Sequence, residues 1–210
     1  MMIQKEFLMT THPKDPAPGR AHPCLYFDAP GPHNTDKTLA AAVEYAEAHK
    51  ISGILVASTS GATGLKAARL FAGKNLIVVS HSTGFLKPDF QQMSPDVRKE
   101  IEGLGARVLT CQHALGGVGR AVRKKLGTYE LEEIIAFSLR IFGHGTKVAV
   151  ECALMAADAG LVSTGEDCLS IGGTATGADT AVLLRPAHAQ NFFDCCVSKF
   201  LAKPRLNVCK

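Results

Sequence analysis

The chain has 210 residues, of which 46% are hydrophobic and 20% are charged. This composition excludes a disordered chain and predicts a folded protein with a substantial core. The formal net charge of +4 is mild, the basic residues are scattered, and there is no Trp and only three Tyr for base stacking, so we expect no nucleic-acid partner.

The N-terminal segment and the cysteines bear on the compartment. Residues 1–6 contain no continuous apolar segment of the kind found in secretory signals, and no apolar stretch approaches the roughly 20 residues of a membrane helix. The seven cysteines form no CxxC motif, so neither a disulfide framework nor a zinc site is indicated and we expect no metal. The sequence therefore predicts a cytoplasmic protein with reduced, buried thiols and no membrane partner.

In chain order, residues 1–23 lack an apolar period and are predicted to form an irregular leader before a single domain over 24–210. A short strand at 24–27 precedes a helix that ends near His49 and has Asn34 and Thr35 as candidate N-caps. The next elements predicted are buried strands at 53–57, 76–79 and 106–109 and helices at 63–72 and 95–104.

The clearest amphipathic helix covers 131–142, with acidic residues in its first turn and Gly143 after its end. An almost wholly apolar helix follows at 147–159. The last two predicted strands, 168–171 and 180–184, are joined by a glycine-rich turn with no helix between them. Strands that alternate with helices predict an α/β fold with a mostly parallel sheet, and this last pair predicts an antiparallel edge.

Ligands of open parallel sheets bind outside the carboxyl ends of the strands, which directs attention to the loops there. The first is Ser58-Thr59-Ser60-Gly61-Ala62-Thr63, between a strand and a helix. A helix start presents unpaired N–H groups, Gly61 allows an anion to approach closely, and the hydroxyls add donors. An ordinary capped turn has the same composition, so a phosphate site and a structural turn both remain open.

Four further loops meet at the same edge of the sheet. They contain His81, Thr83, Gly84 and Phe85; Cys111 to Arg120, interpreted as a flexible connection; Gly173 within a glycine-rich turn; and Asn34 with Thr35 at a helix start. Lys147 and Glu151 are spaced i, i+4 on an apolar helix, where they form either a structural ion pair or part of a site.

With its 58–63 loop between a strand and a helix, the sequence resembles the pyruvate kinase C-terminal domain, in which a Thr/Ser-x-Ser-Gly-Arg-Ser/Thr loop holds a sugar phosphate. Here Ala62 stands in place of the Arg, a departure that argues against a sugar-bisphosphate ligand and leaves the backbone cradle intact. The chain is still more similar to the stand-alone proteins related to that domain, through several motifs. These motifs are Gly31-Pro32-His33-Asn34-Thr35, His81-Ser82-Thr83-Gly84-Phe85, Phe142-Gly143-His144-Gly145-x-Lys147-Val148, Gly177-Ala178-Asp179-Thr180 and Arg185-Pro186-Ala187-His188.

This resemblance implies a three-layer α/β/α fold and binding of flavin mononucleotide (FMN), with no settled catalytic activity. It argues against pyruvate kinase activity, because the catalytic barrel of that enzyme has no room in 210 residues. The phosphate would lie on the loop from Ser58 to Thr63. The ribityl hydroxyls would suit Asn34, Thr35, His81 and Thr83, and the flavin ring would lie near Phe85, Tyr26 and the glycines around Gly173.

Four functions remain open at this point. They are a flavin-binding protein with a regulatory or storage role; a flavin-dependent oxidoreductase in which His81, His144, Lys147 or Glu151 supplies protons; a binding domain for another phosphorylated metabolite; and a hydrolase or transferase that uses Cys111 with His113. The apolar helices could also form an interface between copies of this chain, so a homo-oligomer is a further possibility.

Overall fold

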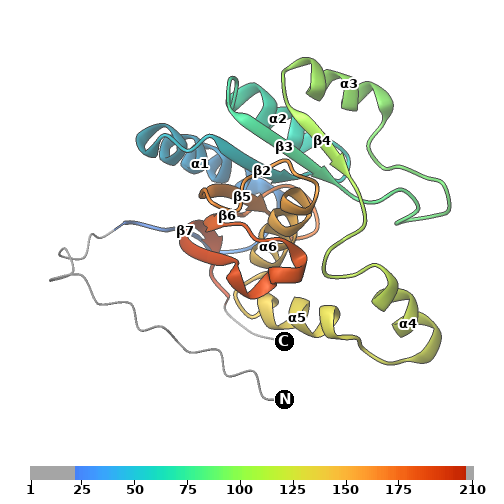
Figure 1. Cartoon of the computed structure of the whole chain (residues 1–210). Helices are drawn as coiled ribbons and strands as arrows, with labels where there is room; N and C mark the ends of the chain where they lie inside the picture. The colour runs from blue at the N-terminus through green and yellow to red at the C-terminus, as the bar shows by residue number, and fades with distance from the viewer. Residues whose placement is uncertain (1–21, 207–210) are drawn as a thin grey trace, which may run out of the picture.

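In the computed structural model, residues 22–206 are described; the expected irregular leader lies almost entirely outside them. A seven-stranded sheet with the order β1-β7-β6-β5-β2-β3-β4 forms the centre of the molecule (Figure 1). The strands are β1 Leu25–Phe27, β2 Gly53–Ala57, β3 Asn75–Ser80, β4 Arg107–Thr110, β5 Cys168–Gly172, β6 Thr180–Arg185 and β7 Cys196–Pro204. The helices are α1 Thr35–His49, α2 Ala62–Leu70, α3 Pro95–Gly103, α4 Val118–Leu126, α5 Leu131–Arg140 and α6 His144–Asp158, with short 3₁₀ turns at Pro32–Asn34 and Ala189–Asp194.

The strand directions confirm the α/β fold with a mostly parallel sheet. β5, β2, β3 and β4 pair in parallel, as do β1 and β7, whereas β6 is antiparallel to both of its neighbours. The predicted antiparallel pairing of the strands at 168–171 and 180–184 is therefore present. The carboxyl ends of β2, β3, β4 and β5 consequently open at one edge of the sheet.

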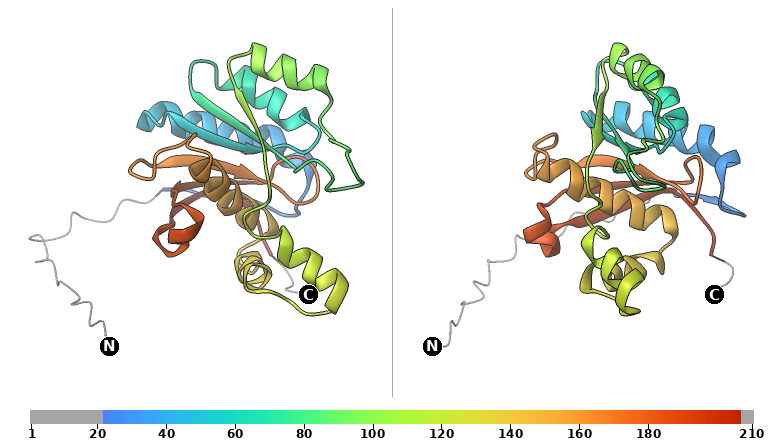
Figure 2. Two further views of the ribbon diagram at one scale, coloured as in Figure 1. Left: turned by 45° about the vertical axis from the view of Figure 1, so that its right-hand side comes forward. Right: turned by 90° about the vertical axis from the view of Figure 1, so that its right-hand side faces the viewer.

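Helices cover both faces of the sheet, as the three layers in Figure 2 show. α1, α2 and α3 cover one face: α1 packs on β5, β6 and β7, α2 on β2, and α3 on β4. Leu39, Ala42, Ile54 and Val78 belong to the core on this face. α6 covers the other face in contact with Leu55, Ile77 and Val182. α5 packs on the outside of α6, and α4 packs on α5. Burial on both faces explains why the central strands consist of continuous apolar runs.

The prediction that the strand at 180–184 is the last one was wrong, because β7 follows it and pairs with both β6 and β1. Lys199 and Lys203 interrupt the apolar pattern of β7. Their amines reach polar partners at the surface: Nζ of Lys199 donates to Tyr45 Oη at 3.1 Å, and Nζ of Lys203 donates to the Phe142 carbonyl at 2.7 Å. Long lysine stems can thus lie along a strand while their charges stay at the surface.

Residues 111–120 were interpreted as a flexible connection. This was wrong for residues 118–120, because α4 begins at Val118. Gly117 precedes the helix with φ of 66° and Gly127 ends it with φ of 76°. Gly119 lies inside the helix, where a side chain would overlap the Glu132 carboxylate of α5. The glycines that suggested a loop instead cap the helix and let two helices approach closely.

No helix among residues 22–206 is long and apolar enough to cross a membrane. Within the same range, His, Cys, Asp and Glu side chains form no group of three that could hold a metal ion.

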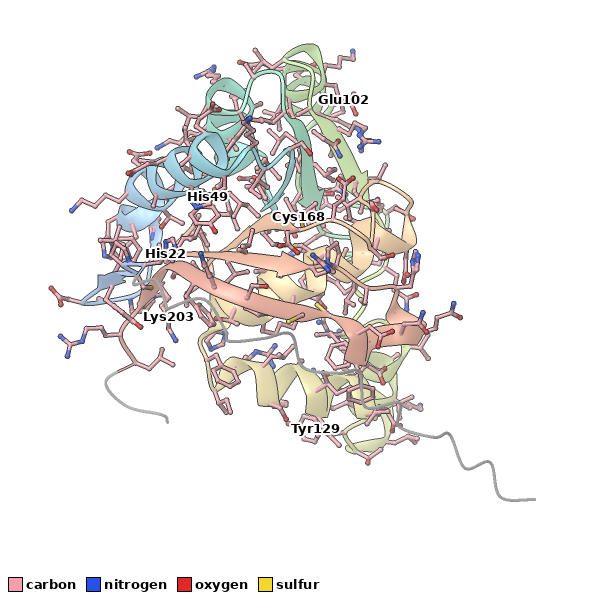
Figure 3. All side chains as sticks on the ribbon, turned by 60° about the vertical axis from the view of Figure 1, so that its left-hand side comes forward. His22, His49, Glu102, Tyr129, Cys168 and Lys203 are labelled. Carbon is pink, nitrogen blue, oxygen red and sulfur yellow. The ribbon has the colours of Figure 1, made fainter. Side chains whose placement is uncertain are left out.

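Cys168 lies in the middle of the sheet, with Glu102 on α3 to one side and Tyr129 beside α5 to the other (Figure 3). Like Cys152, Cys168 is a free thiol packed in the core.

Candidate functional site

A cavity of about 590 Å³ lies at the carboxyl ends of β2 and β3. We call it the 58–63 cavity, because the loop at residues 58–63 forms one end of it. The N-terminal half of α6, the glycine-rich turn at 173–177 and the start of α1 supply further walls. The predicted convergence of loops at this edge of the sheet thus encloses a single space.

The loop at 58–63 turns sharply into α2. Gly61 has φ of 93°, and a side chain there would overlap Val97. Ser58 Oγ accepts the Gly64 N–H at 3.0 Å, and the Gly61 carbonyl accepts the Leu65 N–H at 2.8 Å. Within residues 22–206 no acceptor is found for the N–H groups of Ala62 and Thr63. These donors and the positive end of the helix dipole make this end of the cavity suited to an anion.

His81 connects the loops that follow β2 and β3. Its Nδ1 lies 2.9 Å from Gln92 Oε1, and its Nε2 lies 3.3 Å from Thr59 Oγ1. An amide oxygen only accepts, so Nδ1 donates to Gln92, while Nε2 lies within hydrogen-bonding distance of the Thr59 hydroxyl. His81 therefore orients a side chain of the 58–63 loop from a neighbouring strand.

An aromatic wall of the cavity adjoins His81. The ring centroid of Phe85 lies 4.1 Å from that of His81 and 4.9 Å from that of His113, and the Arg120 guanidinium lies 4.8 Å from the Phe85 ring. Burial lowers the pKa of His113 to about 4, with Glu151 opposing this shift and His81, Arg120 and Lys147 adding to it. The imidazole is consequently neutral at pH 7 and adds a flat, uncharged surface.

Lys147 and Glu151 form a buried ion pair in the cavity wall; only 6% and 4% of the two residues are exposed. The second carboxylate oxygen of Glu151 accepts the Leu115 N–H at 3.0 Å. Both interpretations left open by the sequence thus apply together: the pair is mutually neutralised, and it faces the candidate site.

Asp179 holds the opposite wall together and was missed as an organising residue. It is fully buried, and Oδ2 accepts the N–H groups of Gly31 at 3.1 Å and Thr174 at 3.2 Å. Thr35 Oγ1 donates to the Pro32 carbonyl and accepts the Ala178 N–H. These bonds fix the start of α1 against the glycine-rich turn. The signal in the sequence was an acidic residue at the start of an otherwise apolar strand.

Most of the predicted site residues share this cavity. Thr35, Ser58, Thr59, Ser60, Ala62, Thr63, His81, Phe85 and Gly173 line it. Gly61 does not line the cavity, but its positive φ allows the turn into α2. The cationic lining residues Lys66, Arg120 and Arg140 were missed as site residues. Lys66 lies one helical turn after Ala62, a spacing that could have indicated it.

Four other predicted residues do not line the cavity. Asn34 turns away and donates from Nδ2 to the Ala29 carbonyl at 2.8 Å. Thr83 and Gly84 are exposed in the turn between Ser82 and Phe90, where the Gly84 N–H donates to the Phe90 carbonyl at 3.0 Å. Tyr26 lies on β1 at the far edge of the sheet and is 56% exposed.

The suggested Cys111–His113 pair lacks the geometry of an activated nucleophile. No hydrogen bond joins the two side chains among the described residues, and burial raises the pKa of the Cys111 thiol, with Asp158 adding to the effect. A reactive cysteine needs the opposite shift. His113 lines the cavity, whereas Cys111 does not.

The family model described as pyruvate kinase, alpha/beta domain, matches residues 36–184 of this chain. Among solved structures, a pyruvate kinase from Cryptosporidium parvum is similar at 12% identity and a TM-score of 0.39, covering 73% of this chain and 23% of that one. A Cryptosporidium parvum pyruvate kinase in complex with ADP is similar at 12% identity and a TM-score of 0.36, covering 71% and 22%. The chain thus spans less than a quarter of the length of these enzymes. Because the family model covers most of its residues, the chain belongs to the pyruvate kinase alpha/beta domain family.

Proposed function

We propose that this protein binds a phosphate-bearing small ligand, specifically FMN, in the 58–63 cavity. The observation that carries the proposal is the start of α2, where the N–H groups of Ala62 and Thr63 have no acceptor among the described residues and open into the cavity. Ser58 and Thr63 add hydroxyls on either side. A phosphate group satisfies such a helix start directly.

The charge of the lining supports an anionic ligand. Lys66, Arg120, Arg140 and Lys147 face the cavity, against the carboxylate of Glu151 alone. That carboxylate is already paired with Lys147. Lys66 is also paired, since its Nζ lies 2.6 Å from Asp36 Oδ1. Arg120 and Arg140 have no carboxylate partner among residues 22–206, and their positive field attracts a phosphate dianion and raises its local concentration.

The remaining walls suit a flavin. A volume of about 590 Å³ lies inside the range of roughly 300–1,000 Å³ that is typical of ligand pockets. The flat face of Phe85 and the neutral ring of His113 provide a surface for the isoalloxazine ring, and Thr35 and Thr59 provide oxygens for the ribityl chain. When bound, FMN would supply one- and two-electron transfer; the chain would bind and orient it.

A different phosphorylated metabolite is the second candidate. The phosphate cradle recognises the phosphate alone, so the same observation supports any ligand that carries this group. The proposal assigns no pyruvate kinase activity to these 210 residues. It includes a reducing, cytoplasmic setting, which the free thiols of the described residues favour.

The first experiment is the visible absorption spectrum of freshly purified protein, with mass spectrometry of the compound that heating releases. Full occupancy by FMN supports the first candidate and counts against the second. A colourless protein that takes up no added FMN contradicts the first candidate and leads to a screen of sugar phosphates and nucleotides. Reduction of bound flavin by NADH or NADPH under anaerobic conditions then distinguishes an oxidoreductase from a binding protein.

The variant Ala62→Glu tests the phosphate position. Ala62 is exposed, and an acidic residue in the first turn favours a helix, so the fold should be retained. The new carboxylate should repel the phosphate and weaken FMN binding by about tenfold or more. Leu131→Glu is the matched control, since it places the same charge at the start of α5, outside the cavity. Equal FMN affinity in Ala62→Glu and the wild type would contradict the proposed phosphate position.

A further inference from the structure

A second cavity, of about 720 Å³, lies between α4, α5 and the turn into α6. We call it the α4–α5 cavity. Phe85, Arg120, Arg140 and His144 line both this cavity and the 58–63 cavity, so the two spaces adjoin. Nothing in the proposed binding of FMN uses the body of this second space.

The walls of the α4–α5 cavity combine apolar side chains with guanidinium groups. Leu115 and Ala136 are buried at its base, and Phe137, Ile141 and Leu206 are more than 40% exposed beside it. Exposed apolar side chains grouped beside a cavity are typical of a binding site, because their contact with water is unfavourable.

The three arginines of this cavity differ in their partners. Arg123 is neutralised, since its Nε lies 2.9 and 3.0 Å from the two carboxylate oxygens of Glu133. Arg120 and Arg140 have no carboxylate within salt-bridge distance among residues 22–206; their guanidinium groups lie over the rings of Phe85 and Phe137 at 4.8 and 4.9 Å. Glu133 is the acidic residue of the lining, and Arg123 already occupies both of its oxygens.

Each of these two guanidinium groups lies over an aromatic ring, and both face the junction of the cavities. A guanidinium group in this position presents its N–H donors in a fork that matches a carboxylate. From the two free arginines and the apolar walls we infer that the α4–α5 cavity binds an apolar organic acid, with its carboxylate on Arg120 and Arg140 and its hydrocarbon body against Phe137, Ile141 and Leu206.

The observations favour this ligand over a more polar one. A sugar or nucleotide needs several hydrogen-bonding side chains for its hydroxyls, whereas the lining beyond the arginines, Glu133 and His144 is apolar. An uncharged hydrocarbon would leave the two guanidinium groups without a counter-charge beside an apolar ligand. A single carboxylate at one end of an apolar body matches both parts of the lining.

Isothermal titration calorimetry of the full chain with decanoate, decanol and inorganic phosphate tests this inference. We expect decanoate to bind with one molecule per chain, and decanol and phosphate each to bind about tenfold more weakly or worse, because each lacks one of the two recognition elements. Equal binding of decanol and decanoate would overturn the role of the arginines. Displacement of decanoate by phosphate at similar concentrations would overturn the role of the apolar wall, and no binding of decanoate would overturn the inference itself.

Variants assign the binding to this cavity. Arg120→Gln and Arg140→Gln should each weaken decanoate binding by about tenfold, and Ile141→Ser should weaken it while leaving the charge unchanged. Arg69→Gln is the matched control, because Arg69 is an exposed arginine that pairs with Glu100 on the opposite face of the sheet. Ala62→Glu should bind FMN more weakly and bind decanoate as the wild type does, so the two proposals can fail separately. Unchanged decanoate affinity in both arginine variants would contradict the assignment.

Discussion

Lys147 and Glu151 place two opposite charges on the buried face of α6, where each neutralises the other. Removal of one partner leaves an uncompensated buried charge, which typically costs about 3–5 kcal/mol. We expect Lys147→Met and Glu151→Gln each to lower the free energy of unfolding in urea by an amount of this order. The double variant should lose less than the sum of the two, because neither charge then remains. Additive losses would show that the two side chains act independently.

His113 makes the stability of the protein depend on pH. Burial lowers its pKa to about 4 in the folded state, whereas an unfolded histidine titrates near 6.5. Between these values the unfolded chain binds more protons, so the stability that His113 contributes is present above about pH 6.5 and is lost as the pH falls toward 4. His113→Gln should therefore lose less stability than the wild type between pH 7 and pH 4.5 in urea denaturation.

The control for this pH dependence is His49→Gln, since His49 is exposed on α1 and stacks on Tyr45. It should show the same pH dependence as the wild type. An NMR titration that finds the His113 ring protonated at pH 6 would contradict the explanation.

At the scale of elements, the position of α2 depends on Gly64. A side chain at this position would approach Val78 Cγ1 of β3 to 2.5 Å, and Val78 is a stiff residue in a central strand. Gly64→Ala should destabilise the protein by about 1–3 kcal/mol, more than the gain of about 1 kcal/mol in helix propensity. Because α2 must shift, affinity for a phosphate ligand should fall as well.

Gly103→Ala is the matched comparison, since Gly103 lies in α3 with nothing within 4 Å of the added methyl group. It should leave the stability unchanged or raise it slightly. Urea denaturation of both variants, with ligand titration of Gly64→Ala, tests the close contact of α2 with the sheet. A Gly64→Ala protein as stable as Gly103→Ala would show that α2 adjusts without cost.

The elements that could be predicted from sequence are those with one consistent pattern. Continuous apolar runs identified β2 and β3, and the helical period identified α5. β7 was missed because its lysines resemble surface positions, although their amines bond Tyr45 and Phe142. α4 was missed because its glycines serve helix packing and capping, and one sequence cannot distinguish these roles from a flexible loop.

The same limit applies to the candidate site. The 58–63 loop and His81 could be predicted, because the carboxyl ends of parallel strands meet at one edge of the sheet. Arg120 and Arg140 could not, because they reach the cavity from α4 and α5, far along the chain from that loop. Their placement depends on how α5 packs on α6 and α4 on α5, and no local pattern encodes that packing.

At the scale of the whole molecule, the charge of the protein and of the proposed ligand should determine the salt dependence of binding. The chain carries a formal charge of +4, and the cavity contributes several of its cations. FMN carries a phosphate dianion near neutral pH, whereas riboflavin carries no phosphate. Screening shortens electrostatic attraction to about 10 Å at 0.1 M salt, so FMN affinity should fall with added salt while riboflavin affinity changes little.

Calorimetric unfolding makes this difference measurable on the intact chain. A ligand at about 100 times its dissociation constant stabilises the folded state by about 2.7 kcal/mol, which raises Tm by roughly 5–10 °C for a domain of this size. At low salt we expect FMN to raise Tm by such an amount and riboflavin at the same concentration to raise it by much less. At high salt the difference between the two shifts should become smaller, because salt screens only the charge of the phosphate. Equal shifts for FMN and riboflavin at low salt would mean that the start of α2 does not hold the phosphate, and the loop at 58–63 would then be an ordinary capped turn.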